Sequence, residues 1–253
     1  MNNDTLTIQG LSKHFGDVAV LCDIDATLSA GRVTAFVGPN GAGKTTLFHA
    51  ITGDLKPDSG QVLFRNTDIT GMPPWKIARQ GLGKMFQDVR IFDNLSIREN
   101  VLLALHDHPS QTPWAALFSA RFRRRFAPQL MEEADHWLEK AGVQPPYDRL
   151  AGDLSFGNKK LLALARLMAG EFSLLLLDEP TSGVSPAMIE RISGLISELC
   201  ESGVTVALIE HNFTFVSEIA DYTYLLRQGA IHDGGKTEAV LNKQENREIL
   251  IGL

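Results

Sequence analysis

The sequence predicts an α/β fold in which a mostly parallel sheet is covered by helices and interrupted by a helical insert. A β-branched, apolar strand at residues 32–37 leads through a glycine-rich turn into a helix at 44–52. After Gly157, helices alternate with strands, which is typical of a parallel sheet with helices on its faces. These alternating elements cover residues 159–168, 174–177, 187–200 and 204–209.

The first third of the chain is predicted to be mostly strands. Short β-branched runs are separated there by Gly, Asp or Pro turns. The expected strands cover residues 5–9, 18–27, 33–37 and 61–65. Residues 73–80 then predict a short helix with proline in its first turn, and residues 83–87 predict another strand.

The middle of the chain is predicted to be helical. Residues 97–105 and 130–140 carry apolar side chains at three- and four-residue spacing, and residues 109–128 between them are rich in Pro, Trp and Arg. We therefore expect one domain over residues 1–253. Its nucleotide-binding core with the β subdomain comprises 1–88 and 158–253, and its helical subdomain comprises 89–157.

Composition excludes several classes of protein. The net charge of −6 does not favour general binding to nucleic acid or to anionic membranes, so no nucleic-acid partner is expected. The cysteines at 22 and 200 have no metal-ligand spacing, and there is no secretory signal, which favours the cytoplasm. No apolar run approaches the ~18 residues that span a bilayer. A membrane process would need another chain for its membrane part.

Residues 38–46, GPNGAGKTT, fit the phosphate-binding pattern G-x-x-x-x-G-K-[ST]. Glycines let successive backbone N–H groups curl around a phosphate, while Lys44 supplies a full charge and the Thr45 hydroxyl can ligate Mg²⁺. A glycine-rich turn without a ligand is the alternative, but the flanking strand and helix favour a P-loop NTPase. The expected nucleotide contacts are Asn40, Gly41, Ala42, Gly43, Lys44, Thr45 and Thr46.

A second phosphate motif is the leucine run that ends in Asp178 and Glu179. Ligands of open α/β sheets bind at the carboxyl ends of strands, which is where these two carboxylates are expected. Asp178 is the predicted Mg²⁺ partner, and Glu179 is the predicted general base that polarises an attacking water. An acidic turn after a core strand is the alternative when this motif is considered alone.

Two more side chains are expected at strand ends. His211 follows the strand at 204–210 and can hydrogen-bond a γ-phosphate oxygen and the water. Gln87 could reach Mg²⁺ or the same water through its amide. An incidental histidine and a solvated glutamine are the alternatives.

Residues 154–160, LSFGNKK, complete a set of motifs that in this order resembles the ATP-binding-cassette (ABC) ATPases over essentially the whole chain. The resemblance implies a recombinase-like core, an antiparallel β subdomain at the N-terminus and a helical subdomain. It also implies that ATP is sandwiched between two cassettes arranged head to tail, the partner being homologous or identical. Ser155 and Gly157 of one cassette would then complete the ATP site of the other.

The resemblance also predicts contacts to the adenine base, and the sequence departs from the family pattern at three positions. Phe15 stands where an aromatic side chain stacks on adenine in the family, and Val20 could contact the same base; a core phenylalanine is the alternative. The usual signature has Gly and Gln where this chain has Phe156 and Asn158, and Ser185 replaces a common acidic or Asn residue.

Further segments look like the longer ATPase type of branched-chain amino-acid importers, namely residues 83–96, 209–212 and 247–253. The resemblance implies transmembrane permease subunits, an indirect solute-binding protein, and a peripheral position on the cytoplasmic face of the inner membrane. A permease coupling helix would enter a groove for which the expected residues are Ile91, Phe92 and Leu95. Core packing in the helical subdomain is the alternative for each.

Several other functions are open. A soluble ABC-type ATPase of DNA repair or translation would be expected to carry a long heptad insertion or two cassettes, and neither is present. The solute could also be urea or a lipid. A GTPase has only residues 242–245, NKQE, as a weak guanine motif, and a kinase fits poorly with residues that activate water. The basic cluster at 121–125 could face anionic headgroups or be a solvated helix face.

Overall fold

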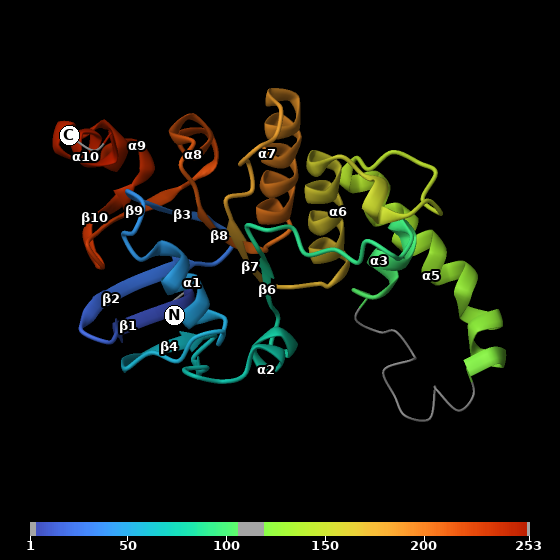
Figure 1. The fold of residues 1–253 in the computed structure, drawn as a ribbon, viewed down its shortest axis with the longest axis horizontal. Helices are drawn as coiled ribbons and strands as arrows, with labels where there is room; N and C mark the ends of the chain where they lie inside the picture. The colour runs from blue at the N-terminus through green and yellow to red at the C-terminus, as the bar shows by residue number, and fades with distance from the viewer. Residues whose placement is uncertain (1–3, 106–118, 252–253) are drawn as a thin grey trace. The chain divides into compact units, whose positions relative to one another are not determined.

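The computed structural model describes residues 4–105 and 119–251, and only the backbone at 119–127 and at 251 (Figure 1). The chain divides into two compact units. The first unit comprises Met1–Gln87, Ser173–Ser182 and Ile192–Leu253. The second unit comprises Asp88–Phe172 and Gly183–Arg191.

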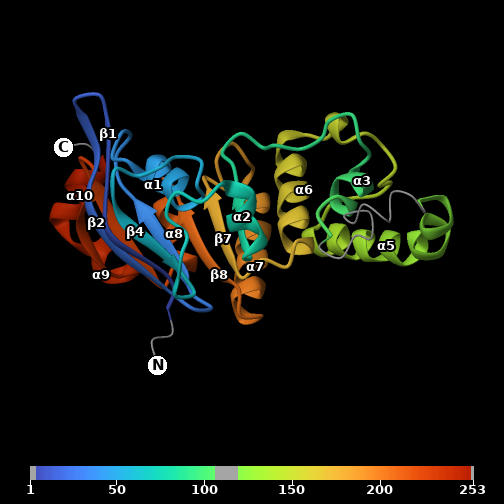
Figure 2. The ribbon, with the colours of Figure 1, turned by 90° about the horizontal axis from the view of Figure 1, so that it is seen from below.

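The first unit contains a four-stranded antiparallel sheet in the order β2-β1-β4-β5. Ile8 of β1 lies opposite Ala26 of β2 and Val62 of β4. All three side chains are buried, so this face of the sheet packs on the core. Figure 2 shows the long β1 and β2 strands running side by side. The strands are β1 (Asp4–Phe15), β2 (Val18–Ser29), β4 (Ser59–Phe64) and β5 (Thr67–Asp68).

The second sheet of the first unit has six strands in the order β10-β9-β3-β8-β7-β6. All neighbours are parallel except β9 and β10, which form an antiparallel pair at one edge. Every residue of β3, β7 and β8 is buried, as expected for strands with helices on both faces. The strands are β3 (Val33–Val37), β6 (Leu82–Met85), β7 (Leu174–Asp178), β8 (Thr205–Ile209), β9 (Tyr222–Arg227) and β10 (Ala230–Lys236).

One apolar core joins the two sheets. The Phe36 ring of β3 stacks on Tyr224 of β9 with centroids 5.4 Å apart, and it meets Phe48 edge to face at 5.9 Å. The helices of this unit are α1 (Lys44–Ile51), α2 (Pro74–Arg79), α8 (Phe213–Ile219), α9 (Thr237–Asn242) and α10 (Gln244–Ile251). Helix α7 (Pro186–Glu201) begins in the second unit and continues into the first from Ile192.

The second unit is helical. Helix α3 begins with a capping box in which Ser96 and Glu99 each accept from the other's backbone N–H. Arg98 of α3 donates to the Asp135 carboxylate of α5 at 2.6 and 3.0 Å, which ties the two helices together. The elements that lie wholly in the second unit are α3 (Ile97–Leu102), α5 (Ser119–Ala141), the 3₁₀ turn η2 (Ala151–Asp153) and α6 (Phe156–Ala169).

The sheets and the helical unit agree with the predicted fold class. The second compact unit, however, extends to Phe172, whereas the sequence placed the boundary at residue 157. Helix α6 packs on α3 and α5, and that tertiary packing assigns it to the helical unit. Helix α5 also begins earlier than expected and contains Pro128. Proline inside a helix removes one backbone hydrogen bond and crowds the preceding turn at a cost of about 3 kcal/mol, which is why the sequence did not predict a helix through this position.

The hairpin of β9 and β10 was not predicted from the sequence. Its two-residue turn consists of Gln228 and Gly229, whose φ angles are 50° and 81°. Positive φ at both positions suits the twist of a tight hairpin. Helix α8 was also not predicted.

No helix in the described part of the chain is long and apolar enough to cross a bilayer. The basic cluster at 121–125 lies within α5, but its side chains are outside the described residues.

Candidate functional site

The glycine loop connects β3 to α1, as the sequence predicted. Two of its glycines are required by the surrounding backbone. Gly38 has φ 151°, and a Cβ there would lie 2.2 Å from the Leu226 carbonyl oxygen. Gly43 caps α1 with φ 100°, and its Cβ would lie 2.6 Å from the Val20 carbonyl oxygen. No larger residue fits either position, so the loop stays tightly curled with its N–H groups at the start of α1.

Lys44 is the first residue of α1 and is buried. Its ammonium group donates to the Gly38 and Pro39 carbonyl oxygens at 2.8 and 2.9 Å. Burial lowers the pKa of Lys44, while the carboxylates of Glu179 and Asp178 oppose that shift. An ammonium group has three donors, so two hold the loop in place and the third can serve a phosphate oxygen.

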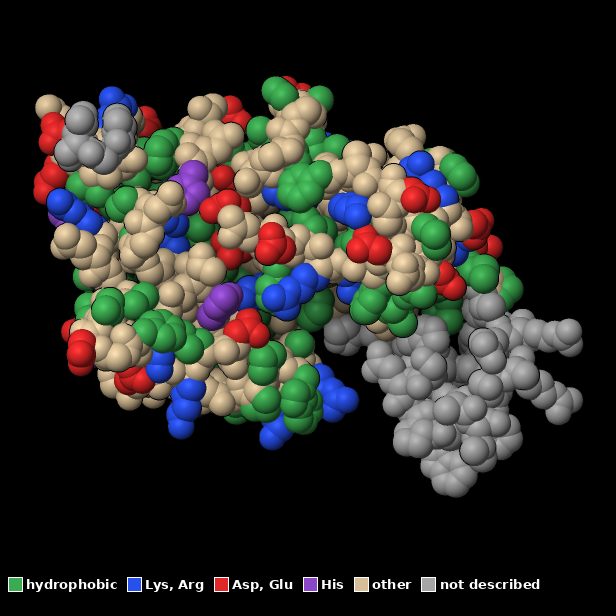
Figure 3. Space-filling model, viewed as in Figure 1, with side chains coloured by type: hydrophobic (Ala, Val, Ile, Leu, Met, Phe, Trp, Pro, Cys, Tyr) green, Lys and Arg blue, Asp and Glu red, His purple; other side chains and the backbone are tan. Residues whose placement is uncertain are grey.

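A concavity of about 290 Å³ opens at this loop. It brings together residues from five separate segments of the first unit, all of which were expected to belong to the site. The described residues that line it are Val20, Asn40, Gly41, Ala42, Gly43, Lys44, Thr45, Thr46, Gln87, Glu179 and His211. Figure 3 shows histidine and acidic side chains adjoining on the face of the first unit that it draws.

Glu179 lies at the centre of this group. Its Oε2 accepts from Gln87 Nε2 at 3.1 Å, and its Oε1 lies 3.4 Å from His211 Nε2. Glu179 has φ 49°, an unusual conformation for a residue with a side chain, and its N–H donates to the Ile209 carbonyl oxygen at 2.9 Å. This bond ties Glu179 to the end of β8 just before His211, which favours the close pairing of the two side chains.

Asp178 ends β7 and is buried. Its Oδ1 has no hydrogen-bond partner among the described residues. Burial and the neighbouring Glu179 carboxylate raise the pKa of Asp178 to about 6, although Lys84 and Lys44 oppose the shift. A buried carboxylate oxygen without a donor is costly, and a bound cation would relieve that cost.

Gln87 and Phe15 lie differently from the positions that the sequence predicted for them. Gln87 is two residues beyond the end of β6, which stops at Met85, yet its amide reaches Glu179. Phe15 is 51% exposed, so the alternative that it is a core residue is wrong. It is not one of the described residues that line the concavity, and Lys13 Nζ lies 5.7 Å from its ring centroid.

Ser155 and Gly157 belong to the second unit, at the start of α6. The Ser155 hydroxyl caps the helix and accepts from the Asn158 N–H at 3.4 Å. A Cβ at Gly157 would lie 3.2 Å from the Met188 side chain. Phe156, the unusual aromatic in this motif, is exposed, and its ring lies 5.3 Å from Lys160 Nζ.

The loop with the expected groove residues is also in the second unit. Phe92 is half exposed, while Ile91 and Leu95 are partly buried. The buried Asn100 amide bonds both the N–H and the carbonyl of Phe92, at 2.9 and 3.0 Å. Arg166 of α6 donates to the Arg90 carbonyl at 2.6 Å and lies over the Phe92 ring. The loop is therefore held firmly although Phe92 faces solvent.

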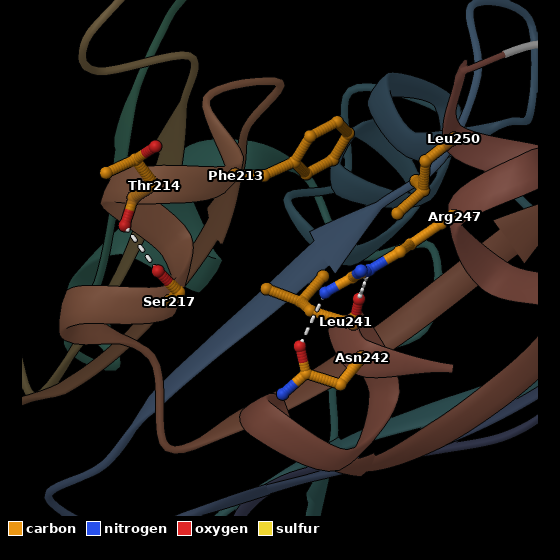
Figure 4. Close-up of a pocket in the computed structure, with 7 residues that line it drawn as sticks. All are labelled: Phe213, Thr214, Ser217, Leu241, Asn242, Arg247 and Leu250. Carbon is orange, nitrogen blue, oxygen red and sulfur yellow. Dashed lines mark hydrogen bonds between the residues drawn. The ribbon is translucent and has the colours of Figure 1, made fainter. Parts of the chain in front are cut away.

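A second groove, of about 360 Å³, lies between α8 and the helices α9 and α10 (Figure 4). Arg247 crosses it and donates to the Leu241 carbonyl at 3.0 Å and to Asn242 Oδ1 at 2.7 Å. Asn242 is the first residue of the weak guanine motif, and its amide oxygen is occupied by this contact. The groove is separate from the residues that line the glycine-loop concavity.

A family model described as ABC transporter matches residues 21–182. The chain belongs to the ABC transporter family. It is therefore a nucleotide-binding ATPase of the ABC type, and the family resemblance predicted from the order of its motifs is confirmed.

Two curated ABC relatives match nearly the whole chain. The high-affinity branched-chain amino acid transport ATP-binding protein BraF of Pseudomonas aeruginosa is 35% identical over 100% of this chain and 99% of its own length. LivG of Escherichia coli, which carries the same description, is 33% identical over 97% of this chain and 96% of its own length.

Solved ABC structures confirm the fold class. The ADP conformation of MJ1267, an ATP-binding cassette of an ABC transporter, has a TM-score of 0.83 and 32% identity and covers 99% of both chains. A nucleotide-free ATP-binding cassette from an ABC transporter also has a TM-score of 0.83, at 31% identity over 99% of this chain and 100% of its own.

Proposed function

We propose that this chain is the ATP-hydrolysing subunit of an importer for branched-chain or related amino acids. The observation that carries the catalytic part is the contact of Glu179 with both Gln87 and His211 at the glycine loop. The transport part is supported by BraF and LivG, which align over almost their full lengths and are described as branched-chain amino acid transport proteins.

In the proposed reaction, Glu179 is the general base. Water attacks the γ-phosphorus of ATP, a new O–P bond forms, and the bond from that phosphorus to the bridging oxygen of ADP breaks. The proton lost by the water goes to the Glu179 carboxylate. His211, 3.4 Å from that carboxylate, orients it and can donate to a γ-phosphate oxygen. The glycine-loop N–H groups and Lys44 stabilise the charge on the phosphates.

The residues present fit a Mg²⁺ site. Mg²⁺ takes oxygen ligands and is usually held by one or two carboxylates together with the substrate phosphates. The orphaned Oδ1 of buried Asp178 is such a ligand, and the Thr45 hydroxyl and the Gln87 amide oxygen lie on residues that line the concavity. When bound there, Mg²⁺ would neutralise charge on the β- and γ-phosphates.

The adenine contacts are proposed to be Phe15 and Val20. Val20 lines the concavity, and the exposed Phe15 offers a free aromatic face for stacking on the base.

A second cassette is proposed to close each ATP site. Ser155 and Gly157 stand at the N-terminus of the 14-residue helix α6, where free N–H groups and the helix dipole favour an anion. The Ser155 side chain is exposed and can reach the ATP of a partner cassette. Whether that partner is identical or a homologue, ATP would join the two cassettes until it is hydrolysed.

The permease is proposed to dock on the loop that contains Ile91, Phe92 and Leu95. Phe92 offers exposed apolar surface there, and Asn100 and Arg166 hold the loop so that a force on it would reach the helices. The complex would place this chain on the cytoplasmic face of the membrane, with a solute-binding protein acting on the permease from the other side.

The proposed function is tested by purifying the chain with its permease in lipid vesicles and measuring phosphate release. We expect the rate to rise when the solute-binding protein is loaded with leucine, isoleucine or valine. Stimulation only by urea or by a lipid would replace the proposed solute class. A chain that does not co-purify with any membrane subunit would favour a soluble ATPase of repair or translation instead.

Arginine in place of Ser155 is expected to prevent closure of the two cassettes, because a long cation would occupy the contact with the partner's phosphates. ATP binding to one cassette should stay within about twofold of wild type, while hydrolysis should fall at least tenfold, a change of about 1.4 kcal/mol or more in the barrier. Fluorescent-nucleotide titration and phosphate release measure the two quantities separately.

Two variants control for other effects of this substitution. Ser155→Ala removes the helix cap, which contributes about 0.5–2 kcal/mol, without adding bulk. Ser197→Arg places the same cation on an exposed position of α7. Normal hydrolysis by Ser155→Arg would rule out the shared site.

A further inference from the structure

Glu210 is a buried carboxylate between the end of β8 and His211. Both of its oxygens accept hydrogen bonds. Oε1 accepts from the Thr181 backbone N–H at 2.8 Å and from the Thr181 hydroxyl at 2.6 Å. Oε2 accepts from the backbone N–H groups of His211 and Asn212 at 3.0 and 3.2 Å. This one side chain therefore joins two segments that are 29 residues apart in the sequence.

All four partners are donors, so the site requires two accepting oxygens. A carboxylate accepts through both oxygens, whereas an amide would turn its NH₂ toward a backbone N–H donor on one side or the other. In the described part of the chain, no lysine or arginine forms an ion pair with Glu210. Its charge is stabilised by these four hydrogen bonds, which are stronger for a charged acceptor than for a neutral one.

The two joined segments both lead to the proposed catalytic group. Thr181 follows Glu179 by two residues, and after Ser182 the chain passes from the first unit to the second. On the other side, the bonds to His211 and Asn212 hold the turn before α8, and Asn212 in turn caps α8 through the Phe215 N–H. The direction of the His211 side chain toward Glu179 depends on this turn.

We propose that Glu210 is a positioning residue for ATP hydrolysis. It fixes the backbone of His211 against the segment that follows Glu179, so that the His211 ring stays within reach of the Glu179 carboxylate. This inference rests on the proposed roles of Glu179 and His211 in hydrolysis.

The test is Glu210→Gln in the full-length protein. Glutamine has the same shape, but its NH₂ must face donors at Thr181 or at His211. We expect kcat for ATP hydrolysis to fall at least about tenfold, which corresponds to 1.4 kcal/mol, while the KM for ATP stays within about twofold. Glu218→Gln, at an exposed glutamate on α8, is the matched control and should leave both values unchanged.

A double-mutant comparison with His211→Ala separates positioning from general loss of stability. If Glu210 acts through His211, the double variant should be no slower than His211→Ala alone, within about twofold. Additive losses, or a kcat of Glu210→Gln within twofold of wild type, would overturn the inference. Should Glu210→Gln fail to fold, Thr181→Val, which removes only the bond from the hydroxyl, is compared with His211→Ala in the same way.

The single variant His211→Ala distinguishes failure of this inference from failure of the proposed function. Wild-type hydrolysis by His211→Ala would remove His211 from the catalytic group and with it the proposed mechanism. Slow hydrolysis by His211→Ala combined with normal hydrolysis by Glu210→Gln would overturn the role of Glu210 alone.

Discussion

Glutamine in place of Glu179 is expected to slow ATP hydrolysis by at least about tenfold and to leave ATP binding intact. A general base contributes roughly 10²–10⁴-fold, and an amide cannot take the proton of the attacking water. Glutamine keeps the size of the side chain and an oxygen that can accept from Gln87, so the concavity should keep its shape. Phosphate release measures the rate, and fluorescent-nucleotide titration measures the affinity.

The same variant should accumulate the closed, ATP-bound pair of cassettes. ATP that is not consumed continues to join the two molecules, so an ATP-dependent dimer or heterodimer is expected in light scattering. Glu201→Gln, at an exposed position at the end of α7, provides the control and should hydrolyse ATP at the normal rate. Wild-type turnover by the Glu179 variant would show that Glu179 is not the base.

The parts of the site that the sequence predicted are carried by short, continuous segments. The glycine loop lies between β3 and α1, and Asp178 and Glu179 follow a run of four leucines, so each segment contains its own strand or helix signal. In a parallel sheet the carboxyl ends of the strands meet at one edge, so His211 was expected at the same edge as Glu179, and its Nε2 lies 3.4 Å from Glu179 Oε1.

The backbone hydrogen bonds that hold the glycine loop in place could not be predicted in the same way. Gly229, in the turn of the unexpected β9–β10 hairpin, donates to the Ala42 carbonyl at 3.2 Å and accepts from the Cys22 N–H at 2.8 Å. Strand β10 contains Asp233, Gly234 and Gly235, which are rare in strands, so its strand signal is weak. Pairing with β9 determines its conformation, and that pairing is a tertiary contact.

The proposed role of the Glu210 side chain could likewise not be predicted from the sequence. In the sequence it is an acidic residue at the end of a predicted strand, and nothing nearby in the chain indicates what it binds. Its role depends on Thr181, which lies on the segment after β7 and reaches Glu210 only because β7 and β8 are neighbours in the sheet. The assignment of helix α6 to the helical unit also depends on tertiary contacts, because it follows from the packing of α6 on α3 and α5.

Alanine in place of Lys44 is expected to remove most of the affinity for ATP. Hydrogen bonds to charged groups contribute about 1.5–3 kcal/mol, and each 1.4 kcal/mol is tenfold in Kd, so the loss should be roughly 10- to 100-fold. The group is buried and close to the Glu179 and Asp178 carboxylates. Without its positive charge, these carboxylates would also repel the phosphates.

Loss of the Lys44 bonds to the Gly38 and Pro39 carbonyls could also alter the loop, and this effect is separable from the loss of charge. Lys44→Met keeps most of the aliphatic length and removes only the ammonium group, so it should weaken ATP binding as much as Lys44→Ala if charge is the cause. Lys76→Ala, on the exposed helix α2, is the control for loss of a lysine elsewhere. Thermal unfolding without nucleotide reports any change in the loop itself. An ATP affinity equal to that of wild type in either Lys44 variant would contradict the assignment of residues 38–46 as the phosphate site, because no other described lysine lines the concavity.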